Sequence, residues 1–329
     1  MNSFWKSLEA PFFVLAPMAD VTDPAYRRVI ASYGRADVMW TEFVSADGLY
    51  HTREMKKMPD AENPLVRDLL FDKGEHPIVA QIFSSKPEMI RYAAKFAGEL
   101  GFDGVDINMG CPDRAIEKQG CGAGMIKRPE LVPSIIQAAR DGVADAGRPF
   151  MGVSVKTRIG YNKEEIDTWI RAVLVEKPDA LTVHLRTRKE MSLVPAHWEL
   201  MPQVVQLRNE VSPETRILGN GDVMSLADAK EKALTTGADG IMLGRAIFGN
   251  PWLFTGRTDA SPKERLRALS ALAEEFQKMR PAKSSHLLKK HVKAFVTGYG
   301  GAAELRGKLM DAPDIDTLQA CIREAVKEL

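Results

Sequence analysis

Polar and charged residues directly follow several short apolar segments of the chain, and their types suit the binding of an anion. Asn220, Gly221 and Asp222 follow one segment, and Gly244 with Arg245 follows the next one along the chain. A glycine leaves backbone N–H groups free to face an anion, and an arginine adds positive charge. Either glycine alone would indicate only a turn, but the two together predict a phosphate-binding site.

Lys156 stands at the end of another apolar segment, MGVSVK at residues 151–156. A lysine at the end of a central strand is costly to bury unless a negative or electron-rich group lies beside it. The N1–C2=O edge of a flavin is such a group, and a carboxylate on a neighbouring strand is the alternative. We expect Lys156 to face a flavin.

The stretch INMGCPDRAIEKQGCGAG, residues 107–124, contains two of the three cysteines of the chain. Cys111 lies between Gly110 and Pro112, just past an apolar segment, where a thiol can meet a ligand and supply a proton to it. An isolated cysteine is more often a small buried hydrophobic residue, and we expect Cys121 to be one. We expect Cys111 to be a catalytic thiol.

Eight short apolar segments predict the strands that position these groups: residues 12–16, 38–40, 78–83, 104–108, 151–156, 180–184, 216–220 and 240–244. Helical periodicity fills most of the gaps, as at residues 88–100, 130–147 and 225–237. This alternation predicts an α/β fold, a (β/α)8 TIM barrel in preference to an open doubly wound sheet. In such barrels the working groups lie at the carboxyl ends of the strands, and phosphates commonly bind after strands seven and eight.

The chain changes character after the eighth predicted strand. TGRTDASP, residues 255–262, has the composition of a linker, and only helical patterns follow it. We expect a catalytic barrel at residues 1–255 and a small all-helical domain at residues 262–329, called the helical tail below. The tail holds 13 Lys and Arg against 9 Asp and Glu, and the rest of the chain holds 32 against 35. This asymmetry is modest, but it favours a nucleic acid as the partner of the tail.

Other classes of protein are disfavoured by composition. Three cysteines in 329 residues are too few for a disulfide framework, which indicates a reducing compartment and a cytoplasmic protein. No run of eighteen apolar residues predicts a membrane span. Zinc-site spacings such as HExxH and CxxC are absent, so we expect no metal.

Several segments match, in order, the motifs of one enzyme family: APMADVTDPAYRR (16–28), TEFVSADGL (41–49), QIFSS (81–85), DINMGCPDRAIEKQGCGAGM (106–125), VKTRIG (155–160), VHLRTR (183–188), NGDV (220–223) and MLGRAIFGNPWLF (242–254). By these motifs the sequence resembles the tRNA-dihydrouridine synthases, flavoenzymes that reduce specific uridines in tRNA. KKHVKAFVTGYGGAAELR (289–306) is similar to the family's C-terminal helical RNA-binding domain. The sequence departs from the family at Leu185, where glycine is common, and at Cys121, where a small residue is usual. The second departure supplies a rival thiol.

The resemblance implies an FMN-binding site made of Ala16, Pro17, Met18, Gln81, Lys156, His184, Asn220, Gly221, Asp222, Gly244 and Arg245. It implies that Cys111 is the proton donor and that Asn108 and Arg158 lie near the flavin and the target base. We also assign Arg186, just beyond His184, to substrate binding. In the implied reaction NADPH reduces FMN, a hydride passes to C6 of a uracil, and the thiol protonates C5 as a general acid.

The helical tail carries the expected contact with RNA. No acidic residue occurs between Glu275 and Glu304, and Lys289, Lys290 and Lys293 lie in that interval. A helix here would place His286, Lys290 and Lys293 on one face. Leu288, Val292 and Phe295 would share another face. A solvated charged face is the alternative, and the resemblance favours RNA-binding lysines.

Two other functions remain open at this point. One is an FMN barrel that acts on free pyrimidines, similar to dihydroorotate dehydrogenase, and the basic tail argues against it. The other is a non-catalytic tRNA-binding protein, against which the combination of Lys156, His184 and Cys111 argues. We expect tRNA and NADPH as partners, and no obligate protein partner is evident.

Overall fold

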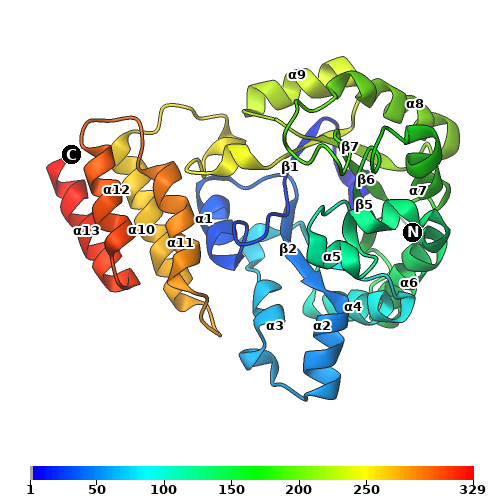
Figure 1. The fold of residues 1–329 in the computed structure, drawn as a ribbon, viewed down its shortest axis with the longest axis horizontal. Coiled ribbons are helices and arrows are strands. Elements are labelled where there is room, and N and C mark those ends of the chain that lie inside the picture. Colours follow the sequence, from blue (N-terminus) through cyan, green and yellow to red (C-terminus); the bar gives the residue numbers. More distant parts are fainter. Residues whose placement is uncertain (1–2) are drawn as a thin grey trace.

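The computed structural model describes residues 3–329 and contains one sheet of eight parallel strands (Figure 1). The strands are β1 (Phe12–Leu15), β2 (Met39–Ser45), β3 (Ile78–Phe83), β4 (Gly104–Met109), β5 (Gly152–Arg158), β6 (Ala180–His184), β7 (Arg216–Asn220) and β8 (Gly240–Leu243). They are paired in the order β1-β8-β7-β6-β5-β4-β3-β2. A parallel bridge between Val14 and Val38 joins the two ends of this order, so the sheet closes on itself. The (β/α)8 barrel expected from the sequence is confirmed.

All eight predicted strand segments are strands, and β2 differs most from its prediction. The predicted segment ends at Trp40, whereas β2 continues to Ser45. The register of its pairing with β3 shifts between Trp40 and Phe43, and the strand carries buried Thr41 and Glu42 at this irregularity. Polar residues interrupt the apolar run there, so the sequence pattern ends before the strand does.

Helices surround the barrel: α1 (Pro24–Gly34), α2 (Ala46–Tyr50), α3 (Pro64–Asp68), α4 (Pro87–Leu100), α5 (Arg114–Lys118), α6 (Val132–Asp145), α7 (Arg171–Val175), α8 (Met201–Val211) and α9 (Leu226–Thr236). The three segments with clear helical periodicity are therefore confirmed as α4, α6 and α9. α4 and α6 pack closely, because a Cβ atom at Gly142 would lie 2.3 Å from the carbonyl oxygen of Arg91. α4 ends at Leu100 and is capped by Gly101, whose φ of 94° is the left-handed conformation typical of a helix end.

The interior of the barrel is apolar at its amino-terminal end. Trp5, from a short helical turn at Phe4–Ser7, is fully buried there and packs against Trp40 with ring centroids 5.5 Å apart. Phe12, Val14 and other apolar side chains belong to the same cluster. Because this end is filled, a ligand can enter the barrel only from the carboxyl ends of the strands, as is usual for this fold.

The helical tail consists of α10 (Pro262–Lys278), α11 (Ser285–Phe295), α12 (Ala302–Asp311) and α13 (Ile315–Glu328). It lies to one side of the barrel, next to α1 (Figure 1). Tyr26 of α1 packs edge-on against His291, with ring centroids 4.6 Å apart, and Arg28 approaches Glu275 at 3.4 Å. The tail is therefore in direct contact with the barrel.

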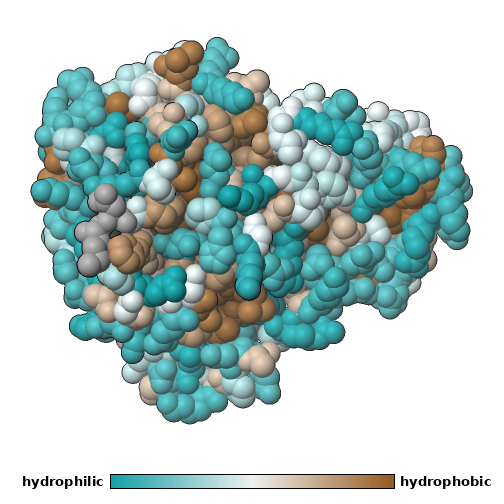
Figure 2. All heavy atoms as spheres, turned by 180° about the vertical axis from the view of Figure 1, so that it is seen from behind, coloured by the Kyte–Doolittle hydropathy of each residue, from teal (hydrophilic) through white to brown (hydrophobic). Residues whose placement is uncertain are grey.

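The surface of the described residues is largely polar on the face seen in Figure 2, where hydrophobic residues form separate patches. Within residues 3–329, no helix has the length and apolar character needed to cross a membrane. The same part of the chain contains no group of His, Cys, Asp and Glu side chains arranged to hold a metal ion.

Candidate active site

A cavity of about 280 Å³ opens at the carboxyl end of the barrel and is called the mouth cavity below. It is lined by Ala16, Pro17, Met18, Lys156, His184, Arg186, Ser192, Asn220, Gly221, Asp222, Val223, Met224, Met242, Gly244 and Arg245. These residues come from β5 to β8 and β1, which are consecutive neighbours in the ring, and from the loops that follow them. Ten of the eleven residues expected to bind a cofactor line this cavity, and Gln81 does not.

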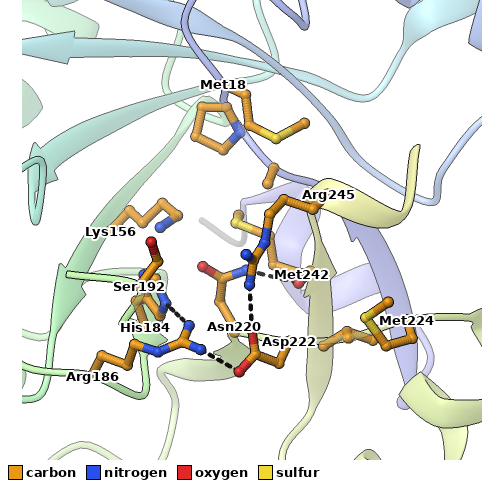
Figure 3. Close-up of a pocket in the computed structure, with 15 residues that line it drawn as sticks. Met18, Lys156, His184, Arg186, Ser192, Asn220, Asp222, Met224, Met242 and Arg245 are labelled. Carbon is orange, nitrogen blue, oxygen red and sulfur yellow. Dashed lines mark hydrogen bonds and ion pairs between the residues drawn. The ribbon is translucent and has the colours of Figure 1, made fainter. Parts of the chain in front are cut away.

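Asp222 joins three loops at one side of the mouth cavity. Its carboxylate accepts hydrogen bonds from the guanidinium groups of Arg186 and Arg245, as Figure 3 shows. The backbone N–H of Ala196 also donates to it, at 2.9 Å. Two arginines share a single carboxylate, so this side of the cavity has an excess of positive charge that suits an anion.

The two glycines that predicted a phosphate site differ in their local roles. Gly221 has a φ of 125°, and a Cβ there would lie 2.8 Å from the Cβ of Ala196, so the turn itself requires glycine. Gly244 has a negative φ, and a Cβ there would stand 3.4 Å from the sulfur of Met18 and 3.5 Å from the Cβ of Ala16. Both of these neighbours line the cavity, so a side chain at position 244 would fill space that is open to a ligand.

Lys156 lines the cavity without a partner of opposite charge. No carboxylate in residues 3–329 lies within ion-pair distance of its ammonium group, and the residue opposite it on β4 is Asn108. Asp106 on the neighbouring strand β4 acts to raise the pKa of Lys156, but it does so from beyond ion-pair distance. Burial lowers the pKa of Lys156 to about 8, and the charge of Arg158 acts in the same direction. An electron-rich ligand would relieve this cost.

His184 is neutral in this environment. Burial and the positive charges of Arg158 and Lys156 lower its pKa well below the usual value. Arg186 Nη1 lies 3.2 Å from His184 Nε2, and a guanidinium group can only donate. Nε2 must therefore accept, which assigns the ring proton to Nδ1. The imidazole therefore lines the cavity as a neutral ring that carries its proton on Nδ1.

Gln81 and Asn108 lie together in the barrel interior, outside the lining of the cavity. Gln81 Nε2 donates to Asp106 Oδ2 at 2.6 Å, and Asn108 Nδ2 donates to Gln81 Oε1 at 3.1 Å. Asn108 Oδ1 accepts from the backbone N–H groups of Gly110 and Cys111, at 3.1 and 2.9 Å. Gln81 and Asn108 are therefore linked by hydrogen bonds to the turn that carries Cys111, and they do not line the cavity.

The two thiols of the 107–124 stretch have different surroundings. Neither lines the mouth cavity, and both pack with Phe83 and Ile116. Burial raises the pKa of Cys111, and the opposing positive charges are those of Lys156 and Arg158. Burial also raises the pKa of Cys121, whose charged neighbours are Asp47 and Lys86. Both thiols keep their proton at neutral pH, and Cys111 alone is in electrostatic contact with a lysine of the cavity.

Arg158 ties two loops together. Its Nε donates to the carbonyl oxygen of Gly110 at 2.9 Å, and its Nη1 donates to those of Thr187 and Met191 at 3.1 and 3.0 Å. Burial lowers its pKa to about 10, which leaves it charged at neutral pH. These bonds hold the turn of Cys111 against the loop that follows β6. Arg186, by contrast, lines the cavity directly.

Five residues of this region were not predicted from the sequence: Asp106, Ser192, Val223, Met224 and Met242. Asp106 had a signal, because it alternates with Asn108 in the strand GVDIN and therefore faces the same side. Met242 faces the barrel interior from an apolar strand, where nothing in the pattern separates it from a core residue. Ser192, Val223 and Met224 lie on loops, where no sequence pattern indicated that they would line the cavity.

A basic groove lies between α11 and α12 of the helical tail. It encloses about 490 Å³ and is lined by His286, Lys289, Lys290, Lys293, Arg306, Gly307 and Met310. The apolar residues Leu288, Val292 and Phe295 are buried on the other side of α11, as the helical pattern predicts. Lys290 pairs with Asp20 at 3.1 Å, two residues beyond Met18 of the mouth cavity. The basic groove therefore lies against the segment that forms one rim of the cavity.

Comparison with known proteins identifies the family. The model of the dihydrouridine synthase family matches residues 14–325. "Probable tRNA-dihydrouridine synthase 2" of Bacillus subtilis (strain 168) is 41% identical over 332 residues, which cover 98% of this chain and 96% of that protein. "Probable tRNA-dihydrouridine synthase" of Staphylococcus aureus (strain Mu50) is 39% identical over 334 residues, which cover 98% and 95%.

Solved structures with low sequence identity share the fold alone. Histamine dehydrogenase from Rhizobium sp. 4-9 matches with a TM-score of 0.51 at 14% identity, over 80% of this chain and 49% of that one. A structure of morphinone reductase in complex with tetrahydroNAD matches with a TM-score of 0.50 at 13% identity, over 76% and 87%. The family model and the close relatives, which extend over almost the whole sequence, show that this chain belongs to the dihydrouridine synthase family.

Proposed function

We propose that this protein is a tRNA-dihydrouridine synthase, an oxidoreductase that reduces the C5=C6 bond of uridines in tRNA with a flavin cofactor. The observation that carries the proposal is the mouth cavity, where Lys156 stands without a counter-ion beside two arginines that share one carboxylate. The cavity therefore suits an anionic, electron-rich ligand such as FMN. The names of the relatives point to the same reaction.

The residues of the cavity fit FMN in two places. The excess positive charge of Arg186 and Arg245, with the open space at Gly244, suits the phosphate. Lys156 suits the N1–C2=O edge of the ring, and the Nδ1–H of His184 adds a donor. When bound and reduced by NADPH, FMN would supply the hydride that the uracil ring receives at C6.

The protein itself holds the proton for the other carbon. We assign Cys111 as the general acid for C5, because its raised pKa keeps the thiol protonated at neutral pH. Cys121 shares the raised pKa but lies among Asp47 and Lys86 rather than beside the lysine of the cavity. We further propose that Asn108 and Arg158 hold the turn of Cys111 and that Arg186 orients the ligand through Asp222.

The partner of the helical tail is proposed to be tRNA. A base must leave the helical stack to reach a cavity inside a barrel, so the RNA must be held by a neighbouring surface. The basic groove with Lys289, Lys290 and Lys293 is such a surface, and it lies next to the cavity rim. Contacts to phosphates would supply affinity there without reading sequence. We propose the barrel of residues 1–255 and the tail of residues 262–329 as the two functional domains.

Two measurements on one preparation test the function. The protein purified with its flavin is incubated with NADPH and with tRNA from cells that lack the gene, and dihydrouridine is measured by mass spectrometry of nucleosides. Free uridine and orotate serve as competing substrates. Dihydrouridine in tRNA supports the proposal. Reduction of the free pyrimidines alone would favour a dihydroorotate dehydrogenase-like enzyme, and a colourless protein that binds tRNA would favour the non-catalytic alternative.

The role of Cys111 is tested by a matched pair of variants. Cys111→Ala should still bind flavin, accept electrons from NADPH and bind tRNA, because none of these steps uses its proton. Oxidation of the reduced flavin by tRNA should slow by about 10²–10⁴-fold, the usual contribution of acid–base catalysis. Cys121→Ala should leave that step within about twofold of the native rate. A slow Cys121→Ala beside a fast Cys111→Ala would reverse the two assignments.

A further inference from the structure

A buried carboxylate that the proposed reaction does not use lies beneath the mouth cavity. Asp106 is fully buried, and no cation in the described chain lies within ion-pair distance of it. It accepts hydrogen bonds from Gln81 Nε2 at 2.6 Å and from Ser154 Oγ at 2.7 Å. The three residues are register partners on β3, β4 and β5. The charge of Lys156 acts on this carboxylate only from beyond ion-pair distance. A carboxylate is expensive to bury without a close counter-ion, so its presence here calls for a specific role.

The carboxylate determines the direction of a chain of hydrogen bonds. An ionised carboxylate only accepts, so Gln81 must turn its NH2 group to Asp106 and its Oε1 away from it. Asn108 Nδ2 donates to that oxygen at 3.1 Å, which leaves Asn108 Oδ1 to accept from the N–H groups of Gly110 and Cys111. A single acceptor-only group therefore orients two side-chain amides, and the second amide holds the turn that carries the thiol.

We propose that Asp106 is a positioning residue for the thiol of Cys111, acting through the side-chain amides of Gln81 and Asn108. The hydrogen bonds alone are sufficient to link Asp106 to the geometry of the turn that carries Cys111. Its catalytic meaning rests on the proposed function, in which Cys111 delivers the proton.

The consequence of losing the carboxylate follows from the same bonds. If the amide of Gln81 turned over, Asn108 would turn with it and point its NH2 group at the N–H of Cys111. Two donors would then face each other, and the turn would have to move. Arg158 and the N–H of Ala123, which donates to the carbonyl oxygen of Cys111 at 2.9 Å, would still hold the turn from other sides. The fold should therefore persist while the thiol becomes less fixed.

The test compares two variants that remove the same charge. Asp106→Asn keeps an oxygen for Gln81, because Ser154 Oγ can accept from the new NH2 group. Asp106→Leu has a similar volume and offers no acceptor. The rate of alkylation of Cys111 by iodoacetamide is measured in the purified holoprotein by peptide mass spectrometry. Cys121 lies on a different tryptic peptide and serves as the internal reference.

We expect Asp106→Leu to raise the alkylation rate of Cys111 relative to Cys121 by about tenfold, and Asp106→Asn to stay within about twofold of the native ratio. Ser154→Ala, which removes the other bond to Asp106, should also stay within about twofold. If Asp106→Leu does not fold, Gln81→Met breaks the same chain and should raise the same ratio. Equal ratios in the Leu and Asn variants, or an unchanged ratio in Gln81→Met, would overturn the proposal.

The catalytic meaning is read from a separate measurement on the same variants. Oxidation of the reduced flavin by tRNA should slow by about tenfold or more in Asp106→Leu and recover in Asp106→Asn. The alkylation ratio needs no tRNA, so it tests the hydrogen-bond chain even if tRNA proves not to be a substrate. A selective change at Cys111 without dihydrouridine formation would refute the proposed function and keep the positioning role. Dihydrouridine formation without that selective change at Cys111 would support the proposed function and refute the positioning role of Asp106.

Discussion

The mouth cavity and the junction between the barrel and the helical tail each contain a lysine that is withdrawn from bulk solvent. Lys156 in the cavity has no counter-ion, and burial lowers its pKa to about 8. Lys283 at the junction has a side chain that is 5% exposed, and it lies 2.6 Å from Glu42, 3.4 Å from Asp68 and 3.9 Å from Asp23. Burial would lower the pKa of Lys283 as well, but these carboxylates raise it above the usual value.

Lys283 has carboxylates at ion-pair distance and Lys156 has none, and this difference distinguishes a lysine with a structural role from one with a functional role. Taking an ammonium group out of water costs several kcal/mol in either place. At the junction the protein offsets the cost with its own carboxylates, so Lys283 holds the tail to β2, α3 and the cap of α1. In the cavity no carboxylate lies at ion-pair distance, and the attraction of Asp106 leaves the pKa of Lys156 lowered, which is typical of a group that meets a ligand. The predictions below test this distinction, beginning with the largest expected effect.

Removal of Lys283 should destabilise the protein strongly. Lys283→Met would leave Asp23 and Glu42 without a cation at ion-pair distance and Asp68 with Arg67 alone. Breaking a buried ion pair costs about 3–5 kcal/mol. We expect a loss of this size in the free energy of unfolding, measured by denaturant titration. Lys278→Met is the control, because the side chain of Lys278 is 63% exposed in its pair with Glu275 and its loss should change the stability little. Equal losses in the two variants would contradict the structural role.

Lysines of the basic groove should behave differently from Lys283, although all lie in the same acid-free interval. Changing Lys289, Lys290 and Lys293 together to glutamine should weaken tRNA binding by about 10–100-fold at low salt. The slope of log K against log salt should become shallower by about 2–3, since each lost phosphate contact removes about 0.9 for a duplex. Flavin content and the free energy of unfolding should change little. Filter binding at several salt concentrations measures the slope. An unchanged slope would mean that these lysines form a solvated charged face and do not contact RNA.

Loss of Lys156 should impair flavin binding and spare the fold. Lys156→Met removes a charge that has no counter-ion, so the free energy of unfolding of the apoprotein should stay equal or rise. Flavin affinity should fall by about tenfold or flavin reduction should slow, because the electron-rich edge of the ring would lose its cation. Flavin fluorescence titration and denaturant titration measure the two effects. Native flavin affinity and reduction kinetics, or a stability loss as large as that of Lys283→Met, would refute the distinction.

The sequence predicted which residues would gather at the mouth cavity where the order of the segments along the chain is enough to place them. Parallel strands in a closed barrel bring their carboxyl ends together, so the residues that follow each apolar run had to meet around one opening. This is why Ala16, Lys156, His184, Asn220 and Gly244 line one cavity although they are far apart along the chain. The expected strands were found for the same reason.

The sequence did not predict what depends on pairing between distant elements. Nothing in the sequence distinguished Lys283 from the other basic residues of the acid-free interval, because its three carboxylates come from the cap of α1, from β2 and from α3. Whether Lys156 had a counter-ion depended on the register of β4 and β5, which places Asn108 opposite it. A one-residue difference in register changes which side chains meet, and local patterns do not fix it.

The smallest predicted effect is a dependence of flavin binding on pH. Lys156 has a pKa of about 8 without ligand, and an electron-rich ligand must raise it, because the ligand favours the charged form. Above pH 8 flavin binding therefore takes up a proton, and the apparent affinity should fall as pH rises, by at most tenfold per pH unit. Below about pH 7 the lysine is already charged, so this contribution should be flat.

Other groups near Lys156 limit how this profile is read. Asp106 has a pKa that burial raises to about 6, so it is already ionised at pH 8. Arg158, with a pKa of about 10, begins to lose its charge towards pH 9.5, but it does so in both proteins that are compared. Cys111, whose pKa burial raises, is present in both proteins that are compared. Affinity is measured by flavin fluorescence at pH 7, 8, 9 and 9.5, with Lys156→Met as the control. The native protein should lose affinity above pH 8 and the variant should not. Parallel profiles of the native protein and the variant would assign the pH dependence to a group other than Lys156. The functional role of Lys156, which distinguishes it from Lys283, would then be contradicted.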